Sequence, residues 1–510
     1  MFLDLARYCG LSHNNLTHYP IKDIVVILPG ITGSVLQKDG EDLWAVSGRS
    51  IWDIVKSKGK ALDALKVKQD DPEAEDLGDG IKAVRLVEDA QVIPGLFKVD
   101  GYTKTTRMIT DNFSNVIRGN IYDDPDDKAA NFYHFPYDWR RDNRASAKIL
   151  KKLLDKRLKR WREYSGNQNA KVILLAHSMG GLVSRYYIEV LEGWKDCKAL
   201  FTFGTPYRGS LNAVSFIANG YKKAFIDLTE VMRSMNSVYQ LMPRYKALKI
   251  DNDFYRIAES PTELSNIDRA KATNALKFHD EIDNAADANI EDQTYQNAFV
   301  TRPIVGVMKP TMQSAELVDG VITISEALPT WLSDDRSYPG DGDGTVPQVS
   351  ATPVQMTPRD ALSIDYIAES HGALQNQPDV LLNLLKRIQS VQSASVQDIR
   401  GSLPIVARGK RSGLKGIGLS IDDLYLINEP ISMQAVTGDA SFNSLLAEIT
   451  CLSHERPVIT ASFTAEHGTW VMTTDALKTG LYRIKVQTDN TSEDAPNPVH
   501  NLFEVANLGE

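Results

Sequence analysis

Cysteine is scarce in this chain of 510 residues, whose three cysteines, Cys9, Cys197 and Cys451, lie far apart in the sequence. Three widely spaced thiols make neither a disulfide framework nor a metal site, and they suit a reducing compartment. The sequence also lacks an apolar run long enough to span a bilayer. Its first residues lack the basic and then apolar pattern of a signal peptide. These absences predict a cytoplasmic protein, with peripheral binding to a membrane as an open alternative.

Positive charge is in deficit, because 57 lysines and arginines stand against 66 aspartates and glutamates, for a net charge of −9. This balance argues against nucleic acid as a partner. The contents of 42% hydrophobic and 24% charged residues are typical of a globular protein. A chain of this length exceeds one ordinary hydrophobic core, so two domains are expected.

The most informative stretch is KVILLAHSMGGL, at residues 171–182. Its continuous apolar run at 172–175 predicts a buried strand, and the LVSRYYIEVLEGW that follows predicts a helix. Strand, small-x-Ser-x-Gly and helix are the nucleophile elbow of an α/β-hydrolase, in which Ser178 is the nucleophile. The sharp turn requires small residues two places before and after the serine, and Ala176 and Gly180 meet that need. The alternative is a serine in an ordinary turn between a strand and a helix.

A second apolar strand is predicted at residues 23–28, and it ends in the glycine-rich loop PGITGS. In an α/β-hydrolase, one amide of the oxyanion hole comes from such a loop and the other directly follows the nucleophile. We therefore predict that the backbone amides of Ile31 and Met179 hold the oxyanion. A plain strand-ending turn is the alternative for this loop.

The nucleophile needs a base and an orienting acid, which follow it in the chain order serine, aspartate, histidine. The sequence GDGDGTVP at residues 340–347 provides the acid, and the Asp-Gly-x-Val turn of many lipases selects Asp343 over Asp341. A calcium loop is the alternative for this run, although the closing glutamate of an EF-hand is missing. His371 is the candidate base, because it follows the strand-like residues 364–367 and the later histidines lie in a β-rich segment beyond.

Two insertions are expected to cover the site, at about residues 43–100 and 211–300. Both carry large apolar residues that look exposed, and Trp52 and Phe216 are the candidate substrate contacts. Ordinary packing is the alternative for the first insertion, and a helical layer of the core is the alternative for the second. The acidic run KQDDPEAEDLGDG is expected to be a solvated loop, and residues 244–300 are expected to be polar and irregular.

A basic amphipathic helix is predicted at residues 145–164. Packing on the sheet is favoured over binding to a membrane surface, because the helix directly precedes the elbow strand. Residues 396–418 are rich in serine, glycine and basic residues and are interpreted as a linker, and the short alternating strands beyond them suggest a β-sandwich. The predicted division is an extension at 1–20, an α/β-hydrolase domain at 21–395, the linker, and a C-terminal β domain at 419–510.

Further motifs accompany the elbow in a characteristic order. They are Pro29-Gly30 with Gly33, PYDWR at 136–140, AHSMG at 176–180, GTP at 204–206 with Gly209-Ser210, GDGTV at 342–346, and His371. In these motifs the chain resembles lecithin:cholesterol acyltransferase-like proteins over about residues 21–390, a family that includes lysosomal phospholipase A and phospholipid:diacylglycerol acyltransferases. Within PYDWR, Asp138 and Arg140 are interpreted as structural, with a catalytic role as the alternative.

The resemblance implies a serine enzyme that takes an acyl chain from a glycerophospholipid or related ester, at a membrane or micelle surface, without a metal or cofactor. His371 would deprotonate Ser178, and the acyl-enzyme would pass its acyl group to water or an alcohol. The chain departs from the family in lacking the lid cysteines and signal peptide of secreted members, and the C-terminal β domain lies outside the family core. The alternatives are an esterase or thioesterase for small acyl substrates, and a catalytically silent protein that recruits a protein partner through its β domain.

Overall fold

The computed structural model describes residues 19–44, 63–88, 91–93, 97–223, 226–333, 340–356, 363–393, 416–438, 442–489 and 495–507. Trp52, nearly all of the predicted extension and most of the predicted linker lie outside the described residues. Within the ranges described, no helix combines the length and the apolar character that crossing a bilayer requires.

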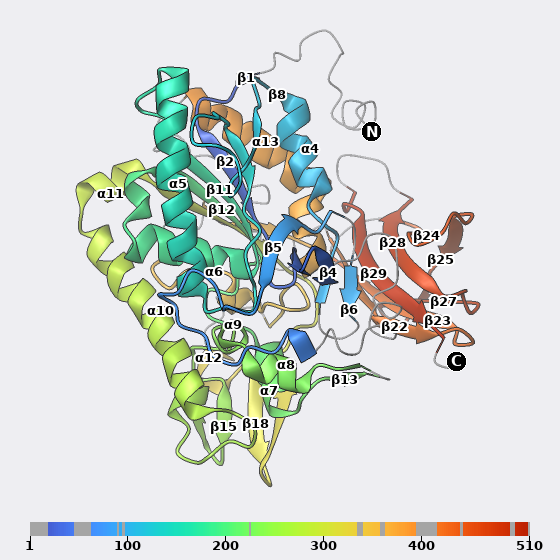
Figure 1. Cartoon of the computed structure of the whole chain (residues 1–510). Coiled ribbons are helices and arrows are strands. Elements are labelled where there is room, and N and C mark those ends of the chain that lie inside the picture. The colour runs from blue at the N-terminus through green and yellow to red at the C-terminus, as the bar shows by residue number, and fades with distance from the viewer. Residues whose placement is uncertain are drawn as a thin grey trace.

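A parallel β-sheet forms the centre of the N-terminal domain (Figure 1). Its strands are β2 (Ile24–Leu28), β9 (Arg118–Asn120), β10 (Phe132–His134), β11 (Val172–His177), β12 (Cys197–Phe203), β17 (Val300–Gly306) and β20 (Asp365–Ile367). Among the described residues the order is β20-β17-β12-β11-β2-β10-β9, and each neighbouring pair is parallel. The carboxyl ends of these strands therefore meet at one edge of the sheet, where ligands bind in open α/β sheets.

Two apolar layers cover the sheet, because successive side chains of a strand point to opposite faces. On β2, Val25 and Ile27 pack into the layer shared with α4 (Thr103–Asn112) and α13 (Pro378–Ser393). Ile24, Val26 and Leu28 pack into the layer shared with α5 (Asn143–Ser165). The α5 helix is the predicted basic amphipathic helix, and its buried side chains pack on the sheet, as the favoured interpretation requires.

The second insertion is more regular than its sequence indicated. The expectation of an irregular segment at 244–300 is wrong, because α10 (Arg269–Ile290) is a regular helix of 22 residues within it. Asp268 caps this helix by accepting hydrogen bonds from the amides of Ala270 and Lys271 at 2.9 and 3.1 Å. Its buried stripe consists of three alanines with Phe278, His279 and Ile282, so the apolar pattern was weak in a polar sequence.

The short helices before α10 are α7 (Leu211–Ala218), α8 (Thr229–Ser234) and α9 (Asn236–Tyr239). The large apolar side chains of residues 211–243 were expected to be exposed, and this expectation is wrong for Ile217, Val231, Met232, Met235 and Met242. Each of these is at most 5% exposed and belongs to the same apolar cluster as one face of the sheet. This part of the insertion is therefore a helical layer of the core, while Phe216 is half-buried at its edge.

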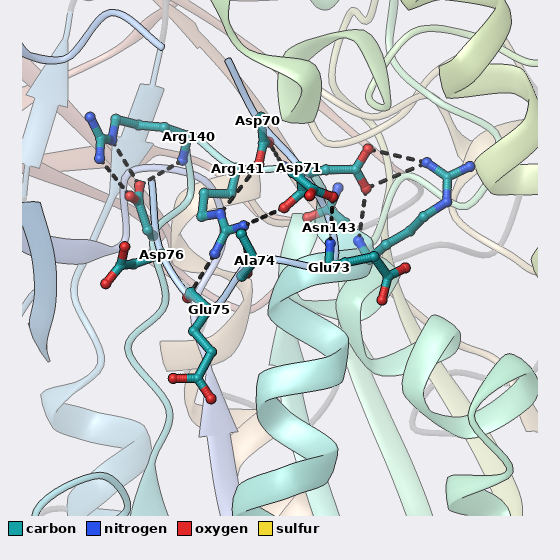
Figure 2. Close-up of polar contacts among 12 residues, drawn as sticks. Asp70, Asp71, Glu73, Ala74, Glu75, Asp76, Arg140, Arg141 and Asn143 are labelled. Atoms are coloured by element: carbon teal, nitrogen blue, oxygen red, sulfur yellow. Dashed lines mark hydrogen bonds and ion pairs between the residues drawn. The ribbon is translucent and has the colours of Figure 1, made fainter. Parts of the chain in front are cut away.

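The acidic run at residues 68–80 is held against the body of the domain by two buried arginines. Figure 2 shows Arg141 pointing into this run, where it donates to Asp70 Oδ1 at 3.3 Å and to the carbonyl oxygens of Asp71, Ala74 and Glu75 at 2.8–2.9 Å. Arg140 donates to both carboxylate oxygens of Asp138 and to Asp79. The run is thus the exposed loop that was expected, and its backbone is in addition anchored to the domain by Arg141. Asp138 and Arg140 have the structural role predicted for them.

The C-terminal region forms a β-sandwich of two sheets, seen as the group of strands at the right of Figure 1. One sheet contains β21 (Ile417–Ile421), β23 (Ile431–Thr437), β26 (Thr464–Glu466) and β27 (Thr469–Thr474). The other contains β22 (Leu424–Leu426), β24 (Leu445–Cys451), β25 (Ile459–Ser462), β28 (Gly480–Thr488) and β29 (Val499–Ala506). Alternate residues of β28, including Tyr482, Ile484 and Val486, fill the core between the sheets. The first strand begins at Ile417, two residues before the predicted start of this domain.

Smaller elements surround the central sheet. The strands are β1 (Tyr19–Pro20), β3 (Ser34–Lys38), β4 (Glu41–Trp44), β5 (Ile81–Leu86), β6 (Gln91–Ile93), β7 (Phe97–Val99), β8 (Phe113–Ser114), β13 (Lys222–Lys223), β14 (Ile226–Asp227), β15 (Leu248–Ile250), β16 (Asp253–Tyr255), β18 (Ser314–Val318) and β19 (Val321–Ser325). The helices are α6 (Met179–Arg185), continued as a π-helix at Tyr186–Val190, α11 (Gln293–Ala298), α12 (Thr330–Ser333) and short 3₁₀ turns at Gly193–Lys195, Ile257–Glu259, Gln348–Ser350 and His371–Asn376.

Candidate active site

Ser178 occupies a strained turn between β11 and α6. Its φ and ψ angles are 51° and −124°, a conformation that costs a non-glycine residue free energy and clusters at functional sites. The turn brings α6 so close to the end of β2 that a Cβ atom on Gly180 would lie 2.5 Å from the carbonyl oxygen of Pro29. The need for a small residue at this position, inferred from the sequence, therefore has a direct steric cause.

The structure brings Ser178, His371 and Asp343 together, although 193 residues separate the first two. His371 Nε2 lies 2.9 Å from Ser178 Oγ, and His371 Nδ1 lies 2.8 Å from Asp343 Oδ2. A neutral imidazole satisfies both contacts when Nδ1–H donates to the carboxylate and Nε2 accepts from the serine hydroxyl. This is the arrangement that a serine nucleophile needs in order to lose its proton.

The two aspartates of the GDGDG run have different partners. Asp343 is 2% exposed, and its Oδ1 accepts from the amides of Thr345 and Val346 at 2.9 and 2.7 Å, which leaves Oδ2 for His371. Asp341 Oδ2 accepts from the amide of Met308 at 3.1 Å. In the part of the chain that the structure describes, no group of three or more metal-ligating side chains is close enough to hold an ion.

The loop after β2 lies directly against the nucleophile. A Cβ atom on Gly30 would lie 2.8 Å from Ser178 Cβ, so the backbone next to Ile31 closely approaches the serine. The PYDWR motif fixes this loop: the Tyr137 hydroxyl donates to Pro29 O at 2.9 Å and the Trp139 indole donates to Ser34 O at 3.0 Å. Ile31 and Met179, the predicted donors of the oxyanion hole, thus belong to the two segments that meet at Ser178.

A buried hydrogen-bonded chain, which the sequence did not reveal, links this loop to His371. The Gly30 amide donates to the Tyr102 hydroxyl at 2.9 Å, and that hydroxyl lies 3.0 Å from His177 Nδ1. His177 Nε2 lies 3.0 Å from the carbonyl oxygen of His371, so Nε2 carries the proton. His177 stands in the elbow motif itself, but nothing local to Tyr102 signals its part in the chain.

His177 is held neutral by its surroundings. Burial, and then the neighbouring His371, lower its pKa to about 3. A neutral ring can accept from Tyr102 and donate to His371 at the same time, whereas a protonated ring would have to turn two donors toward one hydroxyl and one carbonyl. His279, in α10, is a second buried histidine, and burial lowers its pKa to about 4.

Acid should therefore destabilise the fold. Both histidines have a lower pKa in the folded chain than the ordinary value of about 6.5, so the unfolded chain binds more protons below that pH. Their contribution is complete above about pH 6.5 and is lost as the pH falls toward the folded values. Between about pH 6.5 and its pKa in the folded chain, each histidine should lower the free energy of unfolding by about 1.4 kcal/mol for every pH unit of acidification. Urea unfolding at pH 7, 6 and 5 measures the slope.

His279→Gln isolates one of these contributions. His279 Nε2 lies 2.8 Å from Gln240 O, and a glutamine amide can keep this hydrogen bond without titrating. In the variant, the slope of the free energy of unfolding against pH should be smaller by about 1.4 kcal/mol per pH unit. His454→Gln makes the same substitution at an exposed position and is the variant for comparison. An unchanged slope in His279→Gln would contradict the argument.

An apolar cavity of about 50 Å³ opens at Ser178. Its walls include Ile31 and Val99 on one side and Phe216, Val238 and Leu241 of the second insertion on the other. Its polar lining includes His371 and Ser178. Phe216, one of the two predicted substrate contacts, therefore lies in the wall of a cavity that ends at the nucleophile.

Comparisons with known proteins give one family and some weak structural likenesses. Residues 126–379 match the family model of lecithin:cholesterol acyltransferase. No curated protein sequence matches the chain significantly. The lipase BlEst2 of Bacillus licheniformis is similar in its propeptide form at 12% identity and a TM-score of 0.31, covering 96% of this chain and 94% of that one. Its mature form has 15% identity and a TM-score of 0.30, covering 73% and 96%. The CARDB domain of the PF1109 protein from Pyrococcus furiosus, solved with di-metal ions, has 13% identity and a TM-score of 0.14, covering 19% and 98%.

Proposed function

Residues 126–379 belong to the lecithin:cholesterol acyltransferase family, and we propose that the protein is a serine lipase or O-acyltransferase that acts on lipid esters through Ser178, His371 and Asp343. The observation that carries this proposal is the hydrogen-bonded line from Asp343 through His371 to Ser178 at the end of an apolar cavity. A nucleophile with its base, next to an apolar pocket, suits the carbonyl carbon of an ester with an apolar acyl chain.

The mechanism follows from the protonation states. His371 Nε2 accepts the proton of Ser178 as Oγ attacks the ester carbonyl, and Asp343 stabilises the resulting imidazolium and fixes its orientation. The amides of Ile31 and Met179 stabilise the oxyanion, helped by the N-terminus of α6. The imidazolium then gives its proton to the leaving alcohol, and water or another alcohol takes the acyl group from Ser178 by the reverse route.

In its more specific form, the proposal names a glycerophospholipid as the lipid ester that donates the acyl group. A cavity of about 50 Å³ is small beside the roughly 300–1,000 Å³ of sites for drug-sized ligands, so a long acyl chain enters only if the wall opens. This size favours an esterase for short acyl chains as the second candidate. The chain length that the enzyme prefers separates the two.

Phe216→Asp should therefore lower activity on long acyl chains more than on short ones. A carboxylate in the cavity wall must be desolvated when an apolar chain lies against it, and an acetyl group barely reaches it. The ratio of kcat/KM for p-nitrophenyl octanoate to that for the acetate should fall by at least about tenfold, equivalent to about 1.4 kcal/mol. Steady-state kinetics with the two esters measure this ratio.

Phe254→Asp is the matched control, because Phe254 is a half-buried phenylalanine of β16 and is absent from the cavity wall. Its ratio should equal that of the unmodified protein. If the unmodified protein prefers acetate, and Phe216→Asp leaves the ratio unchanged, the short-chain esterase replaces the lipase as the better assignment.

A further inference from the structure

A second and larger cavity, which we call the interdomain chamber, lies between the hydrolase domain and the β-sandwich. Its volume is about 270 Å³. The sandwich contributes Leu419, Ser420, Ile421, Asp423 and Asn501 to its wall. The hydrolase contributes Asn212, Lys309 and the catalytic loop around His371. The C-terminal domain thus forms part of the surroundings of the proposed base.

Contacts beside His371 hold the sandwich in this place. Ser370, the residue before His371, donates from its hydroxyl to His500 O at 2.8 Å, and the His500 amide lies 3.3 Å from Glu369 Oε1. Arg483 of β28 forms an ion pair with Asp100. The Glu369 side chain is fully buried, so the junction excludes water at this point. The wall of the chamber is therefore a fixed part of the site.

The interdomain chamber adjoins the apolar cavity, because Asn212, Thr345 and His371 line both. An ester has an acyl half and an alcohol half, and His371 must reach the alcohol oxygen in order to protonate it as it leaves. The acyl half suits the apolar cavity. The alcohol half must then lie in another space that His371 also lines, and the interdomain chamber is such a space.

We infer that the interdomain chamber binds the alcohol half of the substrate, and that this half is a neutral, hydroxylated alcohol of the glycerol type. The inference rests on the proposed function. The walls of the chamber present hydroxyls, amides and a lysine together with the carboxylate of Asp423, a mixture that suits groups able to both donate and accept hydrogen bonds. The lysine of the wall, Lys309, is balanced by Asp423, so the described residues of the wall carry no excess of positive charge for a phosphate, and an acylglycerol fits the chamber better than a phospholipid headgroup.

Ser420→Trp tests the inference, because Ser420 is an exposed residue of β21 whose enlargement fills the chamber without entering a core. Ethyl butyrate and glyceryl monobutyrate share one acyl group and differ in the alcohol. The ratio of kcat/KM for the glyceryl ester to that for the ethyl ester should fall by at least about tenfold in the variant. Ser462→Trp is the matched control, since Ser462 is exposed on β25 and absent from the chamber wall, and it should keep the original ratio.

The outcomes are distinct. An unchanged ratio in Ser420→Trp, with both esters hydrolysed by the unmodified protein, overturns the inference and leaves the proposed function intact. An equal fall in both variants also overturns it, because the effect is then general. If the unmodified protein hydrolyses neither ester and its Ser178 is not labelled by a fluorophosphonate, the proposed function is wrong. The inference, which rests on it, is then wrong as well.

Discussion

Ser178→Ala should lower kcat/KM for any ester substrate by roughly 10⁴- to 10⁶-fold. Without Oγ there is no acyl-enzyme, and the remaining amides can only polarise an ester for attack by water. Covalent labelling by a fluorophosphonate should disappear completely, because the reagent forms its bond with Oγ. Mass spectrometry of the intact protein measures the labelling, and initial rates on a p-nitrophenyl ester measure turnover.

Ser184→Ala is the control for this experiment. Ser184 is a buried serine within α6, and its hydroxyl donates to Gly180 O at 2.8 Å within the helix. Its removal should cost some stability but leave labelling in place. A Ser178→Ala protein that keeps most of its esterase rate would exclude Ser178 as the nucleophile.

Asp343→Asn should lower kcat by about 10⁴-fold while the fold stays intact. The asparagine oxygen can still accept from the amides of Thr345 and Val346, so its NH₂ group must face His371 Nδ1. That contact forces the proton of the neutral imidazole onto Nε2, and Nε2 can then no longer accept the proton of Ser178. The expected signature is a lost kcat, with fluorophosphonate labelling slowed in proportion.

Asp341→Asn is an unusually close control, because it makes the same change two residues away. Asp341 Oδ2 accepts from the Met308 amide at 3.1 Å, and an asparagine oxygen can do the same. We expect kcat to fall by less than about tenfold, because the substitution leaves the hydrogen bond to Met308 in place and touches no group that acts on the ester. Equal losses in the two variants would mean that the sequence pattern chose the wrong aspartate.

The positions of the candidate site residues could be predicted because they follow from local patterns and chain order. The elbow around Ser178 is a strand, a sharp turn and a helix within a dozen residues, and each part has its own residue preferences. Asp343 and His371 follow in the loops after later strands, and parallel strands bring such loops to one edge of the sheet. The fold of the hydrolase domain was predictable for the same reason.

Local sequence patterns fail to predict a structural element where its buried residues are small, or where its contact partner is distant in the sequence. The α10 helix escaped prediction because alanines form half of its buried stripe, so its apolar periodicity is weak. The anchoring of the acidic run at 68–80 was not predicted, because its partner, Arg141, lies about 70 residues away. The large apolar residues of α7 and α8 looked exposed because the sequence does not say which layer covers them.

The sequence by itself therefore determined the candidate nucleophile, acid and base, the parallel sheet and the presence of a C-terminal β domain, since each depends on short-range residue preferences. The tertiary structure decided what surrounds them. Tyr102 reaches His177 across 75 positions, and the β-sandwich lies against the loop of His371 from about 130 positions away. Such contacts depend on how whole elements pack, and no property of a single segment encodes them.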